Sequence, residues 1–166
     1  MKMIKSLGLV CALILIGASQ ARAVNPSPAF ERLKALAGDW EGKMEDGHAA
    51  NVNYRVISAG SVVIETSMPG EPGEMVTLFH RDGDSLVATH YCGAQNQPRM
   101  RASGLSADGN EIAFKFLDIT NLASPDAEYM REVTIQFQDA DHFTAIWTSR
   151  AQGKDSPMTF TYTRKK

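Results

Sequence analysis

The sequence predicts an all-β protein: an antiparallel up-and-down barrel of about ten strands with a short N-terminal helix. Apolar and polar residues alternate along short segments through most of the chain, as expected for strands with one buried and one solvent-facing side. Turn-forming pairs such as Asp46-Gly47 and Asp82-Gly83 separate these segments at intervals of about eight to twelve residues. An open sheet of this size would leave two edges unpaired, and closure into a barrel removes them.

The first 23 residues predict a secretory signal peptide that is removed on export. Lys2 and Lys5 precede an apolar run from Leu7 to Ala18, and Ala21-Arg22-Ala23 supplies the small residues of a cleavage site. Because this run is too short to span a bilayer as a helix, we expect no stable membrane insertion after cleavage. The protein is therefore expected to be exported, either periplasmic or secreted.

Charge and length limit the possible partners and the number of domains. The full chain has 17 Lys and Arg against 19 Asp and Glu, and the predicted signal removes three of the basic residues and no acid. Apart from Arg164-Lys165-Lys166 no basic run is present, so we expect no nucleic acid partner. After a lead-in at 24–28, residues 29–166 suffice for one barrel domain, and the sequence predicts no oligomeric state.

The first predicted element is a helix at 29–37. Phe30, Leu33 and either Leu36 or Ala37 fall on one helical stripe, and Gly38 follows as a C-terminal cap. We expect this helix to plug or buttress one end of the barrel.

The strands follow in order. Trp40, Gly42 and Met44 alternate with charged residues in the first of them. The connection 118–129 is the one long interruption, and Ser124-Pro125 predicts the capped start of a short helical turn near 124–129. The predicted strands cover residues 39–46, 49–58, 61–68, 74–81, 85–92, 99–105, 111–117, 130–138, 142–150 and 155–164.

Gly38-Asp39-Trp40, directly after the helix and opening the first strand, resembles the G-x-W signature of calycin barrels: lipocalins, fatty-acid-binding proteins and nitrobindins. The resemblance implies that Trp40 closes one barrel end beneath an arginine from the last strand, a role that Arg164 fits by cation–π stacking. Nitrobindins hold haem through a histidine near the chain's end. The last strand here has no histidine and His142 opens the one before it, so we do not expect haem binding by inheritance.

The sequence is also similar to a family of exported bacterial proteins in which the same motifs follow in the same order. That resemblance covers most of the mature chain but implies no activity, because none is known for the family. The motifs here are Gly38 to Gly42, Ser58 to Ser61, Glu74 to Thr77, Thr89 to Cys92 and Asn96 to Met100.

The segment THYCGAQNQPRMRA, residues 89–102, carries most of the candidate chemistry. His90 and Cys92 lie two residues apart, hence on one strand face and about 7 Å apart. They could share a soft metal or act as base and nucleophile. A zinc site requires a third protein ligand, and only His80 is a further candidate nearby. We expect no cofactor, and keep haem or a metal ion as the alternative.

The position of His80 relative to His90 depends on the hairpin between them. A two-residue loop at Asp82-Gly83 pairs Met75 with His90 and places the two histidines on opposite faces. A three-residue loop places them on the same face. We favour the two-residue loop because it gathers the apolar side chains of both strands on one face.

The polar residues after Cys92 are expected at the barrel mouth. Arg99 and Arg101 share a strand face: an interior face would suit an anionic head group, and an exterior face would be solvated or paired with acids. We therefore predict an exported barrel that binds a small, partly apolar ligand without catalysis. A haem, metal or thiol enzyme site and a filled structural barrel remain the alternatives. The candidate ligand-binding residues are His90, Cys92, Gln95, Asn96, Gln97, Arg99 and Arg101.

Overall fold

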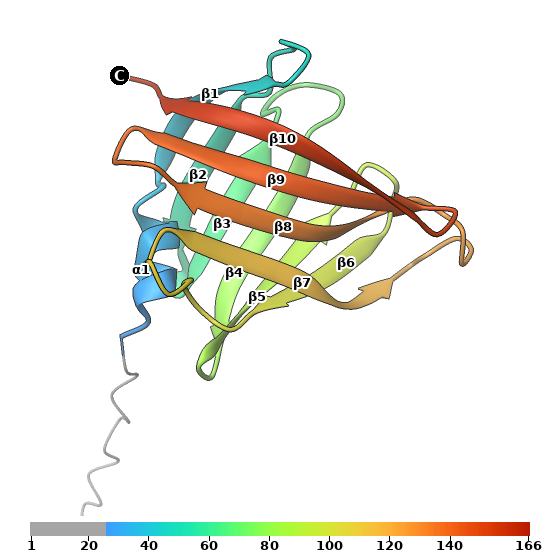
Figure 1. Ribbon diagram of the computed structural model, residues 1–166, viewed down its shortest axis with the longest axis horizontal. Coiled ribbons are helices and arrows are strands. Elements are labelled where there is room, and N and C mark those ends of the chain that lie inside the picture. The colour runs from blue at the N-terminus through green and yellow to red at the C-terminus, as the bar shows by residue number, and fades with distance from the viewer. Residues whose placement is uncertain (1–25) are drawn as a thin grey trace, which may run out of the picture.

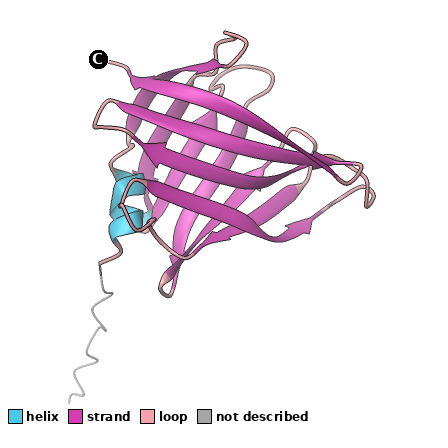
Figure 2. Ribbon diagram, in the orientation of Figure 1, coloured by secondary structure: helices cyan, strands magenta, loops and turns pink. Residues whose placement is uncertain are grey.

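The computed structural model describes residues 26–166, and the predicted signal peptide lies outside the described residues. It confirms the all-β prediction: ten antiparallel strands close into a barrel (Figure 1), with one α-helix at its N-terminal side (Figure 2). The elements are α1 (Pro28–Lys34), β1 (Gly38–Met44), β2 (Val52–Ile57), a 3-10 turn (Ser58–Gly60), β3 (Val62–Ser67), β4 (Met75–Asp82), β5 (Ser85–Tyr91), β6 (Gln97–Ala102), β7 (Glu111–Thr120), β8 (Tyr129–Phe137), β9 (His142–Ala151) and β10 (Lys154–Arg164).

Each strand pairs with its neighbours in the chain, and β1 closes the barrel by pairing with both β2 and β10. The ladders differ in length. β9 and β10 pair from Ala151 and Lys154 to His142 and Thr163, whereas β7 and β8 pair only from Glu111 to Phe114. The ladder between β7 and β8 therefore leaves much of both strands unpaired with each other, and that between β1 and β2, from Gly38 to Trp40, is also short.

The helix α1 covers one end of the barrel. Ser27 caps it by accepting a hydrogen bond from the Phe30 N–H at 3.4 Å, and Phe30 and Leu33 are buried. The helix ends at Lys34, three residues before its predicted end, and two turn hydrogen bonds lead the chain into β1. Gly38 begins that strand with φ of +130°, and a Cβ there would lie 3.1 Å from Arg164 Nη1, so a larger residue would be strained and crowded.

Trp40 and Arg164 meet at this closed end. They are register partners of β1 and β10, and the Arg164 guanidinium carbon lies 4.1 Å from the centre of the Trp40 ring. The Trp40 indole N–H donates to the Leu36 carbonyl at 2.8 Å. The structure thus shows the packing that the calycin resemblance implied.

Two local predictions are wrong. Residues 124–129 form no helical turn: one hydrogen bond, from the Ala127 N–H to the Ser124 carbonyl at 3.0 Å, makes a simple turn. Within residues 26–166 no helix is long and apolar enough to cross a membrane.

The β4–β5 hairpin turns at Gly83-Asp84, one residue later than predicted. Gly83 has φ of +61°, which suits the first central position of a tight hairpin turn. The register moves by two residues, so His90 pairs with Thr77 instead of Met75. A shift of two preserves side-chain direction, so His80 and His90 still point to opposite faces, with His90 inside.

Candidate ligand cavity

A cavity of about 200 Å³ occupies the barrel end away from α1. It is formed where the strands and loops of that end leave the interior incompletely filled, and its wall is mainly apolar. Aromatic side chains from the last two strands form one side. The residues that line it are Met44, Ala49, Ala50, Asn51, Ser67, Met68, Met75, His90, Met130, Trp147, Met158, Phe160 and Tyr162.

Methionine dominates this lining. Every methionine of residues 26–166 except Met100, which is packed in the core, faces the cavity. The thioether chain is unbranched and adaptable, so such walls suit apolar molecules of varied shape. The cavity is therefore apolar and deformable.

His90 is a buried polar residue of the cavity wall, which also includes Asn51, Ser67 and Tyr162. Its side chain is 2% exposed, and Nδ1 lies 3.0 Å from Thr77 Oγ1. The imidazole packs against Trp147 with ring centres 4.9 Å apart, while Nε2 is buried without a hydrogen-bond partner. Burial lowers the pKa of His90 to about 4, so the ring is neutral at pH 7.

A row of polar side chains crosses the barrel interior at the level of His90. Tyr54, Glu65, Thr77 and His90 are successive register partners on β2 to β5. The Tyr54 hydroxyl donates to Glu65 Oε2 at 2.6 Å, and the Ser67 hydroxyl donates to Oε1 at 3.1 Å. Burial raises the pKa of Glu65, against the opposing effect of these two hydrogen bonds.

The sequence analysis missed this buried carboxyl. Glu65 follows Val63 on one strand face, so the alternation itself places an acid on an apolar face. The Tyr54 hydroxyl on the paired strand supplies the hydrogen bond that a buried acid needs. The pairing of Tyr54 with Glu65 depends on a strand register that the sequence does not specify.

The remaining predicted residues of the loop build its conformation. The Cys92 N–H donates to the Asn96 carbonyl at 3.1 Å, and the Asn96 amide donates to the Glu128 carbonyl at 2.8 Å. Gln97 accepts from the Thr120 hydroxyl at 2.9 Å and donates to the Gln95 carbonyl at 3.2 Å. Of the seven predicted ligand-binding residues, His90 alone lines the cavity.

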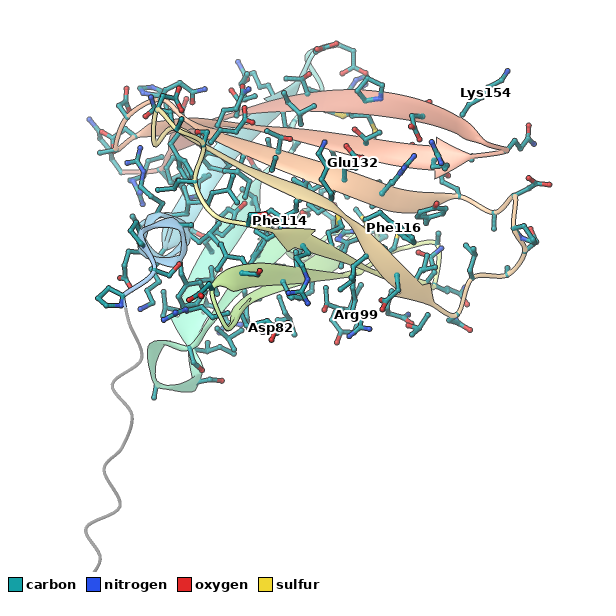
Figure 3. All side chains as sticks on the ribbon, turned by 60° about the horizontal axis from the view of Figure 1, so that its bottom comes forward. Asp82, Arg99, Phe114, Phe116, Glu132 and Lys154 are labelled. Atoms are coloured by element: carbon teal, nitrogen blue, oxygen red, sulfur yellow. The ribbon has the colours of Figure 1, made fainter. Side chains whose placement is uncertain are left out.

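The arginine pair lies on the outer surface, where Figure 3 shows Arg99 and Asp82. Arg99 is paired with Asp118, and Arg101 Nη2 lies 2.7 Å from Asp82 Oδ2. The exterior alternative therefore describes both side chains, and neither faces the cavity.

The other candidate ligands are not gathered around His90. His80 lies on the opposite face of β4, with Nδ1 3.0 Å from the Arg81 carbonyl, and the exposed His142 is 2.9 Å from Asp139. Residues 26–166 contain no cluster of three or more His, Cys, Asp or Glu side chains able to hold a metal ion. A haem macrocycle is also far larger than the cavity, so these residues do not fit that group.

Comparison with known proteins supports the fold. No protein-family model and no curated protein matches the sequence. The crystal structure of Rv2717c from M. tuberculosis is similar at a TM-score of 0.56 and 14% identity, covering 86% of this chain and 100% of that one. A DUF3598-family protein of unknown function from Nostoc punctiforme is similar at a TM-score of 0.51 and 12% identity, covering 80% of this chain. The alignment spans 49% of that longer protein.

Proposed function

We propose that the protein is an exported barrel that binds one small, partly apolar molecule in the methionine-lined cavity. The observation that carries this proposal is His90, which lines the cavity and whose buried Nε2 has no hydrogen-bond partner among residues 26–166. A buried polar atom left unsatisfied costs about 1–3 kcal/mol, and a ligand that reaches it removes this cost. The apolar wall supplies the remaining binding energy by excluding water.

Binding is favoured over thiol catalysis by the position of Cys92. Its sulfur accepts a hydrogen bond from the Ala94 N–H at 3.5 Å and is not part of the cavity wall. An imidazole that is to activate a thiol must lie within hydrogen-bond reach of it, and His90 instead bonds Thr77.

One observation favours a second candidate, a site for a soft metal ion such as Cu(I). Thioethers from Met44, Met68, Met75, Met130 and Met158 share the cavity with the unpartnered imidazole nitrogen of His90. Thioether and imidazole donors together suit Cu(I) better than harder ions. Stoichiometric copper in protein isolated from its own compartment would replace the small-molecule proposal.

The test is native mass spectrometry of the protein from the exported fraction, followed by binding of small aromatic probes. We expect the measured mass to correspond to a chain that begins near Val24, and we expect a small molecule to co-purify with it. Ala50→Phe, which adds a ring to the cavity wall, should abolish probe binding, and Arg99→Gln on the outer surface should leave it unchanged. Failure of the wild-type protein to bind any probe would instead indicate a filled structural barrel.

A further inference from the structure

We infer that the ligand is an uncharged molecule with a compact apolar body and one hydrogen-bond acceptor oxygen, which accepts from the Nε2–H of His90. This inference rests on the proposed function and identifies the chemical class that the same cavity selects. It depends on three features of the site: the direction of the His90–Thr77 hydrogen bond, the absence of charged groups in the wall, and the cavity volume.

The hydrogen bond to Thr77 decides which nitrogen of His90 carries the proton. Within residues 26–166 the Thr77 hydroxyl has no hydrogen-bond partner other than His90 Nδ1. If Nδ1–H donated, the hydroxyl proton and Nε2 would both be buried without partners. If the Thr77 hydroxyl donates to Nδ1, only the Nε2–H is unpaired. Donation by the hydroxyl is therefore favoured over donation by Nδ1–H by about 1–3 kcal/mol. The proton then lies on Nε2, on the buried edge of a ring that lines the cavity, where it is a donor without a protein acceptor among residues 26–166.

The wall lacks any group that would compensate a charge. None of the described residues that line the cavity is Lys, Arg, Asp or Glu. The nearest buried acid, Glu65, is already bonded by the hydroxyls of Tyr54 and Ser67 and lies behind the wall. A carboxylate or ammonium in this space would be desolvated without an ion partner, which costs far more than one hydrogen bond returns. A neutral acceptor such as a ketone, ester or ether oxygen avoids that penalty.

The volume limits the apolar body. An apolar cavity of about 150 Å³ accommodates benzene, so about 200 Å³ holds a molecule of about ten non-hydrogen atoms. Trp147 flanks the imidazole, so a flat ring can stack on the indole while its oxygen reaches Nε2.

Three probes of equal size separate the features. Acetophenone carries a ketone oxygen, α-methylstyrene replaces that oxygen with a methylene group of the same shape, and benzoate carries a charge. Isothermal titration of the mature protein, residues 24–166, should give acetophenone the highest affinity, about tenfold above α-methylstyrene, as expected for one neutral hydrogen bond to a buried donor. Benzoate should bind more weakly than either.

Two variants assign the preference to one atom. His90→Leu removes the donor, so we expect acetophenone and α-methylstyrene to bind with equal affinity. His90→Gln retains an N–H donor of similar reach, so it should restore part of the preference. Circular dichroism and the melting temperature establish that each variant is folded before its affinities are compared.

The outcomes distinguish this inference from the function on which it rests. Equal wild-type affinities for acetophenone and α-methylstyrene would overturn the acceptor requirement while leaving a small-molecule binder in place. Tighter binding of benzoate would overturn the neutral class. If no probe binds, the proposed function fails and the inference fails with it.

Discussion

The buried side chain of His90 lowers the stability of the fold and is also the centre of the proposed binding site. The His90 ring packs against the apolar Trp147 ring and is hydrogen-bonded to the Thr77 hydroxyl. The Glu65 carboxyl lies beyond Thr77 and is already hydrogen-bonded to Tyr54. A histidine in such a position is tolerated because it is neutral, and its unpaired N–H is a cost that the proposed ligand would remove.

This burial predicts that His90 makes the protein less stable in acid. The pKa is about 4 in the folded chain against an ordinary 6.5, so below pH 6.5 the unfolded chain binds a proton that the folded chain does not. Stability therefore falls as the pH drops from 6.5 to 4, by up to about 3 kcal/mol. His90→Gln should lose less stability over this range in urea titrations at pH 7 and pH 4.

Glu65 provides the internal reference for that measurement. Its raised pKa has the opposite sign: protonation of the buried carboxyl in acid favours the folded chain. Because the wild-type protein and His90→Gln both retain Glu65, its contribution cancels in their difference. Parallel pH profiles for the two proteins would contradict the buried neutral histidine.

Among the elements, α1 and the end of β10 depend on one another through Arg164. Its guanidinium donates to the carbonyls of Ala35 and Ala37, both at 2.9 Å, and to that of Ala140 at 3.0 Å. The Ala35 and Ala37 carbonyls follow the last turn of α1, and the Ala140 carbonyl belongs to the β8–β9 loop. The Arg164 side chain therefore joins α1, this loop and β10 at the closed barrel end. Orphan carbonyls after a short helix need such partners.

We therefore expect Arg164→Ala to lower the free energy of unfolding by about 2–4 kcal/mol, through loss of charge-assisted hydrogen bonds and the stacking on Trp40. Arg164→Lys keeps the charge but not the planar fork, so it should recover only part of this loss. Urea titration measures both. Lys165→Ala, beside it and 3.9 Å from Glu41 on the surface, is the control and should leave stability nearly unchanged. An equally small effect of Arg164→Ala would contradict the role given to it.

The elements were predictable to the extent that local pattern determines them. Alternation and turn residues placed all ten strands within a few residues of their observed bounds. They left open which way the face of His90 points, and the structure turns it inward. Register was not predictable: Gly83 with positive φ suits both the predicted Asp82-Gly83 turn and the observed Gly83-Asp84 turn, so the local sequence does not choose between them. The partnerships of His90 with Thr77 and of Glu65 with Tyr54 depend on that missing information.

The cavity is a property of the whole molecule and left no local signal. Its methionines come from separate strands and loops that are distant in sequence, and only barrel closure brings them together. The predicted loop residues, by contrast, were singled out because they are polar and adjacent in sequence. Polar residues that are close in sequence proved to form a hydrogen-bonded loop. The side chains that line the cavity are instead spread over the chain.

The strand ladders also predict how a ligand reaches the cavity. Beyond Phe114 and Val133, β7 pairs only with β6 and β8 only with β9, and Figure 1 shows the two strands diverging. Phe116 is on the inward-facing side of β7 yet 36% exposed, because β8 has moved away from it. In Figure 3 it lies in the space between these strands, and its ring is 5.3 Å from that of Tyr129. Met130, next to Tyr129, lines the cavity, and the aromatic pair lies beside the opening between β7 and β8 without lining the cavity itself.

We accordingly expect Phe116→Ala to speed both association and dissociation of acetophenone several-fold while the equilibrium affinity changes little. The ring contributes to the barrier along the route but not to the bound state, so it affects both rate constants in the same proportion. Stopped-flow fluorescence of Trp147, which faces the cavity, follows the exchange. Leu117→Ala is the matched control, since Leu117 is the next residue on the same strand with similar exposure and the opposite side-chain direction. Unchanged rates in Phe116→Ala would show that ligands pass instead through the barrel end, between the loops that precede β2 and β4.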